Sequence, residues 1–124
     1  MTNDTFEPPV AIAIYKTYMS FAPHLYRFPK LYRYSLGGAI ENNILVLLEL
    51  IFEANALPRP LREASLIKAN AKCEILKMLI RMSFELKILE NTQYFQLSSE
   101  LREIGKMLGG WIKFVRSGPY VRSE

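Results

Sequence analysis

Residues 94–115, YFQLSSELREIGKMLGGWIKFV, give the clearest indication of the fold, because their apolar side chains recur at steps of three and four. This spacing predicts an α-helix that buries one side. We expect the helix to begin at a cap, Asn91 or Thr92, and to run to about Val115. The recurring residues are Tyr94, Leu97, Leu101, Ile104, Leu108, Trp111 and Val115.

Three more helices are predicted upstream. The first runs from about Val10 to Arg27, and Pro23 is expected to kink it or end it early. Ser35 is expected to cap the second, and the third is expected to run from Pro60 to Leu89. No stretch alternates as a strand does, so the prediction is an all-α, up-down-up-down four-helix bundle. The apolar stripes are Ile14, Tyr15, Tyr18, Ala22, Leu25 and Tyr26 in the first helix, and Leu36, Ile40, Leu47, Ile51 and Ala54 in the second.

The third helix has apolar residues on two nearly opposite sides. A four-helix bundle covers one side of each helix well, so a second apolar side needs another partner. We expect the longer stripe to form the core and the shorter one to form an interface between subunits. The alternative is a helix buried more deeply in its own core. The longer stripe is Ala64, Ala71, Ile75, Met78, Met82, Leu86 and Leu89, and the interface stripe is Cys73, Leu76, Ile80 and Phe84.

The composition is that of a single globular domain, with 124 residues of which 50% are hydrophobic and 23% are charged. We expect the bundle to occupy residues 10–116, with flexible ends at 1–9 and 117–124. The first ten residues lack the features of a signal peptide, and the apolar run at 44–52 is too short to span a bilayer. The single cysteine suits a reducing compartment. These features predict a soluble, cytoplasmic protein with no membrane partner.

Positive charge is concentrated in two places, although the net charge is only +4 and the isoelectric point about 9.3. On the fourth helix, cations at steps of four, seven and three share one stripe with Gly109, which leaves a notch where a phosphate could approach. In the turn after the first helix, cations alternate with Tyr26, Tyr32 and Tyr34. Such arrays are typical of nucleic-acid binding; the alternative is that both groups are simply solvated. The candidate binding residues are Arg27, Lys30, Arg33, Arg102, Lys106, Lys113 and Arg116.

Nothing in the sequence predicts catalysis or a cofactor. His24 has no second histidine beside it, and with Cys73 it offers too few ligands for zinc. No glycine-rich phosphate loop follows a strand. We therefore expect no catalytic residues, no metal and no cofactor. A rival interpretation, an enzyme, would need two or more glutamates facing one another inside the bundle, as in helical di-metal sites.

Three segments together resemble a known family: YRFPKLYRYSLGGAIENN at 26–43, LREASLIKANAKCEILKMLIRMSFELKIL at 61–89 and EIGKMLGGWIK at 103–113. In this order and spacing they are similar to the accessory variability determinant proteins of diversity-generating retroelements. Those proteins belong to a wider group of bacterial four-helix proteins, some of which are encoded in ribosomal RNA intervening sequences. The similarity covers about residues 15–113.

The resemblance implies a four-helix protomer that assembles into a homopentameric barrel. It also implies a non-enzymatic protein whose basic surfaces bind RNA or DNA and a reverse transcriptase during mutagenic cDNA synthesis. The cations of the turn, and those of the fourth helix up to Lys113, match positions that are often basic in that family. The alternative is an oligomeric protein-interaction scaffold of the intervening-sequence type.

Overall fold

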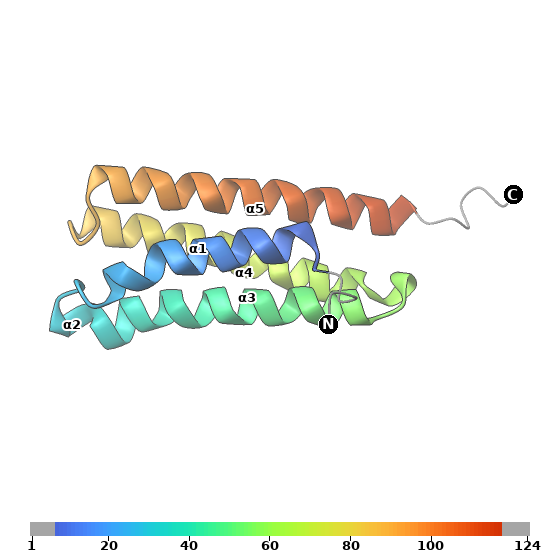
Figure 1. The fold of residues 1–124 in the computed structure, drawn as a ribbon, viewed down its shortest axis with the longest axis horizontal. Helices are drawn as coiled ribbons and strands as arrows, with labels where there is room; N and C mark the ends of the chain where they lie inside the picture. Colours follow the sequence, from blue (N-terminus) through green and yellow to red (C-terminus); the bar gives the residue numbers. More distant parts are fainter. Residues whose placement is uncertain (1–6, 118–124) are drawn as a thin grey trace, which may run out of the picture.

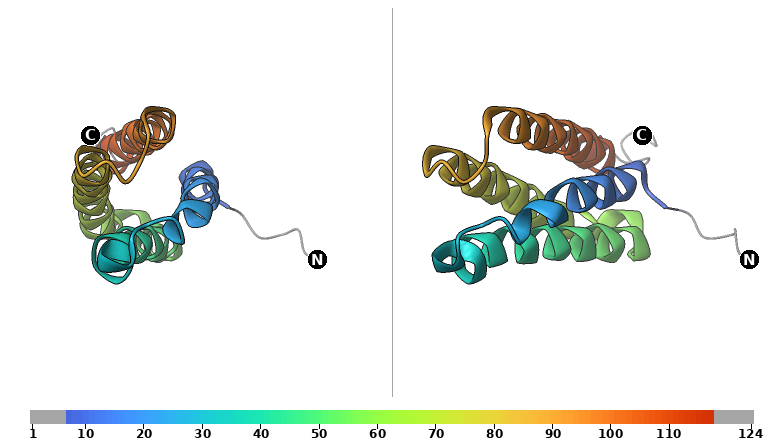
Figure 2. Two further views of the ribbon diagram at one scale, coloured as in Figure 1. Left: turned by 90° about the vertical axis from the view of Figure 1, so that its left-hand side faces the viewer. Right: turned by 60° about the vertical axis from the view of Figure 1, so that its left-hand side comes forward.

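The computed structural model describes residues 7–117, and the long elements in that range are all helices. Successive long helices run in opposite directions, with the turn after α1 and the α4–α5 connection at the same end (Figure 1). Seen along the bundle, they follow one another around a common core (Figure 2). The predicted four-helix, up-down-up-down fold is confirmed for this part of the chain. The long helices are α1 (Pro9–Leu25), α3 (Gly38–Ala56), α4 (Glu63–Glu85) and α5 (Asn91–Ser117).

Of the flexible ends predicted at 1–9 and 117–124, residues 1–6 and 118–124 lie outside the described residues. Pro9 is the first residue of α1 and Ser117 is the last residue of α5. The helical part therefore extends one residue beyond the predicted 10–116 at each end. Pro9 suits a first helical position because its missing N–H has no partner inside the helix there.

The core is formed largely by the stripes predicted in the second and fourth helices. Most of these residues are fully buried, whereas Leu36, Tyr94 and Trp111 pack at the edge of the core. The prediction for the first helix is only partly right, because Tyr15 and Tyr26 are 59% and 68% exposed. The buried side of α1 is Val10, Ala11, Ile14, Thr17 and Phe21, and that of α5 is Leu97, Leu101, Ile104, Leu108 and Val115.

The two apolar sides of α4 face the opposite ways from those predicted: the shorter stripe faces the core, and most of the longer one is exposed. Cys73, Leu76 and Ile80 are buried inside the protomer, and Phe84 is half-buried against Tyr94, with 4.2 Å between the ring centroids. Assigning Cys73, Leu76 and Ile80 to a subunit interface was wrong, because the protomer itself already covers them. The buried side continues through the small residues Ser65, Ala69 and Ser83, which let neighbouring helices approach closely. The outward side consists of Ala64, Ala71, Ile75, Met78, Met82 and Leu86, and only Leu89 of the predicted core stripe is buried.

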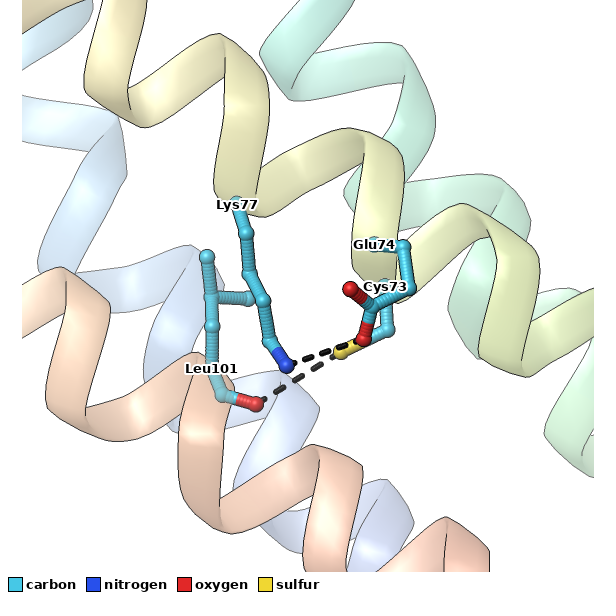
Figure 3. Close-up of polar contacts among 4 residues, drawn as sticks. All are labelled: Cys73, Glu74, Lys77 and Leu101. Carbon is cyan, nitrogen blue, oxygen red and sulfur yellow. Dashed lines mark hydrogen bonds and ion pairs between the residues drawn. The ribbon is translucent and has the colours of Figure 1, made fainter.

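Contact between α4 and α5 keeps the single cysteine in the protein interior. The Cys73 thiol donates to the backbone oxygen of Leu101, with 3.5 Å between sulfur and oxygen (Figure 3). Burial raises the pKa of the Cys73 thiol, so the reactive thiolate is disfavoured. Cys73 is therefore a packing residue at this helix contact.

Helical structure ahead of the second long helix begins earlier than predicted, although α3 itself begins only at Gly38. A short helix, α2 (Lys30–Tyr32), leads through a π-helical turn, η1 (Arg33–Gly37), directly into α3. Ser35 lies inside the π-helical turn, where its hydroxyl faces the Leu31 carbonyl oxygen at 3.5 Å, so it is not the cap that the sequence suggested. Gly37 permits close packing, since a Cβ there would lie 2.7 Å from Leu25 Cδ1 and 3.1 Å from Phe28 Cδ2.

The ends of α4 and α5 differ from the predicted boundaries by a few residues. A short 3₁₀ turn, η2 (Arg59–Leu61), contains Pro60, and α4 begins only at Glu63. At the other end Lys87 adopts the left-handed conformation, with φ 64°, and terminates the helix at Glu85 rather than at Leu89. At the start of α5, the Gln93 side-chain oxygen accepts the Glu90 N–H at 3.0 Å, which is half of a capping box.

By length and composition alone, the continuous helical segment Lys30–Ala56 could cross a membrane, with a mean hydropathy of 1.4 over its most apolar window. A core helix meets the same criteria, but only 28% of that window is buried here. Polar contacts tie the segment to its neighbours, because Glu41 accepts the Tyr18 hydroxyl at 2.7 Å and Glu53 accepts the Ser65 hydroxyl at 2.6 Å. The bundle core thus explains part of the apolar character, while Phe52 remains 43% exposed.

Candidate nucleic-acid interface

The outer side of α5 carries the basic stripe predicted from the sequence. Arg102, Lys106, Lys113 and Arg116 are all exposed, on the side of the helix away from Leu101, Ile104 and Leu108. With a rise of 1.5 Å per residue, the stripe is about 21 Å long. We call these four residues the α5 stripe.

Three cations of the α5 stripe keep their charge uncompensated. Arg102, Lys106 and Lys113 form no ion pair with any residue in 7–117, whereas Arg116 pairs with Glu63 at 2.5 Å. Gly109 lies within the stripe, and a Cβ placed on it would meet nothing within 4 Å. The backbone is therefore accessible at this point, as the notch predicted from the sequence requires.

Two cations that the sequence interpretation left out stand beside the α5 stripe. Lys77 and Arg81 of α4 line a shallow groove of about 300 Å³ with Arg102 and Tyr94 of α5. Lys77 pairs with Glu74 at 2.9 Å (Figure 3), and Arg81 pairs with Glu85 at 3.0 Å. Exposed pairs of this kind contribute at most about 1 kcal/mol, so a phosphate could exchange for either carboxylate. Lys77 and Arg81 are four residues apart, and this spacing in the sequence already indicates that both lie on one side of α4.

The turn between α1 and α2 holds its three cations differently. Arg27 and Lys30 are exposed and form no ion pair in the described part of the chain. The Arg33 guanidinium instead donates to the backbone oxygens of Tyr26, at 2.9 Å, and Phe28, at 3.2 Å. Arg33 is therefore engaged in holding the turn together. We call Arg27, Lys30 and Arg33 the turn cluster.

The two groups of cations occupy separate parts of the surface. The turn cluster lies at one end of the bundle, whereas the α5 stripe runs from Arg102 toward the opposite end (Figure 1). The tyrosines of the turn also separate, since Tyr32 packs against the core and Tyr34 is 81% exposed. The sequence could not show that Tyr32 and Tyr34 have different exposure, because this depends on the conformation of the π-helical turn.

Two titratable groups with perturbed pKa values, His24 and Tyr18, lie outside the α5 stripe and its groove. Burial, together with the charge of Arg27, lowers the pKa of His24, and the hydrogen bond to Glu41 raises the pKa of Tyr18. Within residues 7–117, no group of three or more His, Cys, Asp or Glu side chains could hold a metal ion.

The fold and the surface charge define a small all-helical protein with a basic outer face. The profile of the bAvd-like family matches residues 13–115, most of the chain, and the protein belongs to that family. This confirms the resemblance to accessory variability determinant proteins, which are accessory rather than catalytic proteins. No curated protein and no solved structure matches the chain.

Proposed function

We propose that this protein is a non-enzymatic accessory protein of a diversity-generating retroelement that binds nucleic acid and the reverse transcriptase in the cytoplasm. In this role it supports mutagenic copying of a template RNA into cDNA. Membership of the bAvd-like family supports the accessory role. The observation that carries the binding proposal is the α5 stripe, with three exposed cations that lack an ion-pair partner within residues 7–117.

Electrostatics favours a polyanion as the ligand of the α5 stripe. Like charges along one helix side repel one another, and the phosphates of a nucleic acid would relieve that repulsion. Each phosphate that is neutralised also releases condensed counterions, which favours binding at low salt. The groove cations Lys77 and Arg81 widen the basic surface toward α4.

The proposal includes assembly into a homopentamer, as the family resemblance implies. The corrected candidate for the contact between copies is the outward side of α4, in place of the buried stripe. On this side Ile75, Met78, Met82 and Leu86 are 43–53% exposed. Large apolar side chains at neighbouring positions on one helix are typical of an interface.

The test is complex formation with the reverse transcriptase and the template RNA of a diversity-generating retroelement. We expect the three components to elute together in size-exclusion chromatography. Reversing two stripe charges, Lys106→Glu with Lys113→Glu, should remove the protein from the RNA-containing complex. The matched control, Lys16→Glu with Lys68→Glu, changes the net charge equally at exposed positions outside the stripe and should leave the complex intact.

A second candidate function is an oligomeric protein-interaction scaffold. The apolar outward side of α4 is the observation that favours it, because protein partners bind such surfaces. In that case the protein would bind a polypeptide partner without RNA, and the stripe variant would behave like the control. If neither RNA nor the reverse transcriptase is bound at low salt, the retroelement function is wrong.

A further inference from the structure

A second surface, distinct from the α5 stripe, has the composition of a nucleobase site. It is a groove of about 510 Å³ between α1 and the segment that leads from η1 into α3, at the end of the bundle that carries the turn cluster. Ligand pockets in proteins commonly have volumes of about 300–1,000 Å³. We call it the turn groove. Its lining includes Tyr18, Tyr26, Arg33, Tyr34, Gly38 and Glu41.

Two aromatic rings of the turn groove have free faces. Tyr26 is 68% exposed and Tyr34 is 81% exposed, and neither ring stacks on another ring in residues 7–117. By contrast, Tyr94 is stacked on Phe84 at 4.2 Å between centroids. Exposed rings in a groove are platforms on which an unpaired base can stack, because every base has a π face.

The interior of the turn groove offers a fixed hydrogen-bond acceptor. The Tyr18 hydroxyl donates to Glu41 Oε2 at 2.7 Å and so orients the carboxylate, whose Oε1 accepts no hydrogen bond from the described residues. Arg33 Nε is buried without a hydrogen-bond partner in the same part of the chain, while its NH2 group is held by the turn. Gly38 leaves space beside them, since a Cβ there would meet only the Arg33 carbonyl oxygen, at 3.8 Å.

These groups select a base rather than a phosphate. A carboxylate repels a phosphate, but it accepts hydrogen bonds from the amino and imino groups on the edge of a base. The exposed cations Arg27 and Lys30 belong to the same turn, so the phosphates of a bound strand have separate partners close in sequence. Aromatic rings combined with such cations are the features of single-strand binding sites.

We propose that the turn groove binds one unpaired base of single-stranded nucleic acid, stacked on Tyr26 or Tyr34 with an amino group donated to Glu41. This inference rests on the proposed function, because it adds a base site to the phosphate-binding surface. Cytosine is favoured over uracil. The two rings have the same size, but the cytosine amino group projects from the ring with two N–H donors. The only donor on the same edge of uracil, N3–H, lies between two carbonyl oxygens that the carboxylate repels.

The experiment measures the fluorescence anisotropy of labelled oligo(C) and oligo(U) of twelve nucleotides, at fixed low salt, with the full-length protein. Oligo(C) should bind more tightly than oligo(U), by roughly two- to tenfold for one hydrogen bond. Glu41→Gln should remove or reverse the difference, because the amide oxygen accepts the Tyr18 hydroxyl and the NH2 group then takes the place of Oε1. There it donates to a uracil oxygen and repels the cytosine amino group. Replacing both rings, Tyr26→Ala with Tyr34→Ala, should weaken oligo(C) binding by roughly 5- to 150-fold. The matched control, Tyr26→Phe with Tyr34→Phe, should retain it.

Two results would overturn the inference, and they differ in what they say about the proposed function. If the alanine pair binds both oligonucleotides as the wild type does, while Lys106→Glu with Lys113→Glu does not bind, the base site is wrong and the α5 stripe stands. If the wild type binds neither oligonucleotide, the nucleic-acid function fails together with the base site. Circular dichroism of each variant checks that the bundle is folded, and the phenylalanine pair separates loss of stacking from loss of structure.

Discussion

The turn cluster and the α5 stripe are built from the same kinds of side chain, yet the protein uses their charges differently. In the turn, Arg33 is bound to two backbone oxygens, so one of the three cations helps to hold the chain in place. Along α5, the helix backbone satisfies itself, and Arg102, Lys106 and Lys113 extend from a rigid support into solvent. Arg102, Lys106 and Lys113 are therefore available to a ligand, whereas Arg33 is engaged by the backbone of the turn.

The largest expected effect separates the two regions by their contribution to RNA affinity. Neutralising the three stripe cations that lack an ion pair within residues 7–117, by Arg102→Gln with Lys106→Gln and Lys113→Gln, should change the salt dependence of single-stranded RNA binding. The slope of log affinity against log salt should become shallower by about two. If the two proteins bind equally at 1 M salt, this difference in slope corresponds to a loss of RNA affinity on the order of a hundredfold at 0.1 M salt. Neutralising Arg27 and Lys30 should cost less, because only two phosphate contacts are involved. A greater loss from the turn pair, measured by fluorescence anisotropy, would reverse the comparison.

The next effect separates the regions by stability. Arg33→Ala removes two charge-assisted hydrogen bonds from the turn and should lower the free energy of unfolding by about 1–3 kcal/mol. Arg27→Ala removes an exposed side chain without an ion pair in residues 7–117. It should change the free energy of unfolding by less than about 0.5 kcal/mol. Urea denaturation followed by circular dichroism measures both. Equal values for the two variants would show that Arg33 is not structural.

A smaller effect tests whether the notch in the α5 stripe is open. Cβ atoms at Gly109 and Gly110 would both meet nothing within 4 Å, so alanine at either position should stabilise the helix by about 0.5–1 kcal/mol. The two glycines lie on different sides of α5, because only Gly109 lies in line with the cations of the stripe. A bulkier residue, Gly109→Leu, should therefore weaken RNA binding more than Gly110→Leu. Thermal unfolding checks the first expectation, and destabilisation by Gly109→Ala would contradict it.

The smallest effect concerns the histidine next to the turn cluster. Burial and the charge of Arg27 lower the pKa of His24 below 6.5, so its contribution to stability is complete above about pH 6.5 and is lost as the pH falls through the folded-state pKa. Arg27→Gln removes the second cause, and the His24 pKa should rise toward 6.5 in an NMR titration. An unchanged pKa would mean that burial alone lowers it.

Much of the fold could be predicted from the sequence because the apolar residues of α5 recur regularly along one side. For α5, the steps of three and four from Leu97 to Val115 leave one possible inward side, and that side is buried. On α4 the sequence could not choose between Cys73–Leu76–Ile80 and Ile75–Met78–Met82, because both stripes are apolar. Packing decides which stripe is buried. Small residues of α4, such as Ser83, lie on the same side as the Cys73 stripe and let the neighbouring helices approach it.

The exposed cations of the candidate site could also be predicted, but their partners could not. Helical spacing alone placed Arg102, Lys106 and Lys113 together. It could not show that Arg116 pairs with Glu63, which lies 53 residues away, or that Arg33 donates to the backbone oxygens of Tyr26 and Phe28. Both depend on contacts that form only when the chain has folded.

The most direct test of the central claim is a salt titration of RNA binding by the wild-type protein, followed by fluorescence anisotropy. Neutralisation of three to seven phosphates predicts a linear log-log plot with a slope between about −2 and −5, at roughly 0.7 per phosphate on a single strand. Absence of binding at about 50 mM salt, or an affinity that does not change with salt, would contradict the assignment of the α5 stripe as a nucleic-acid interface.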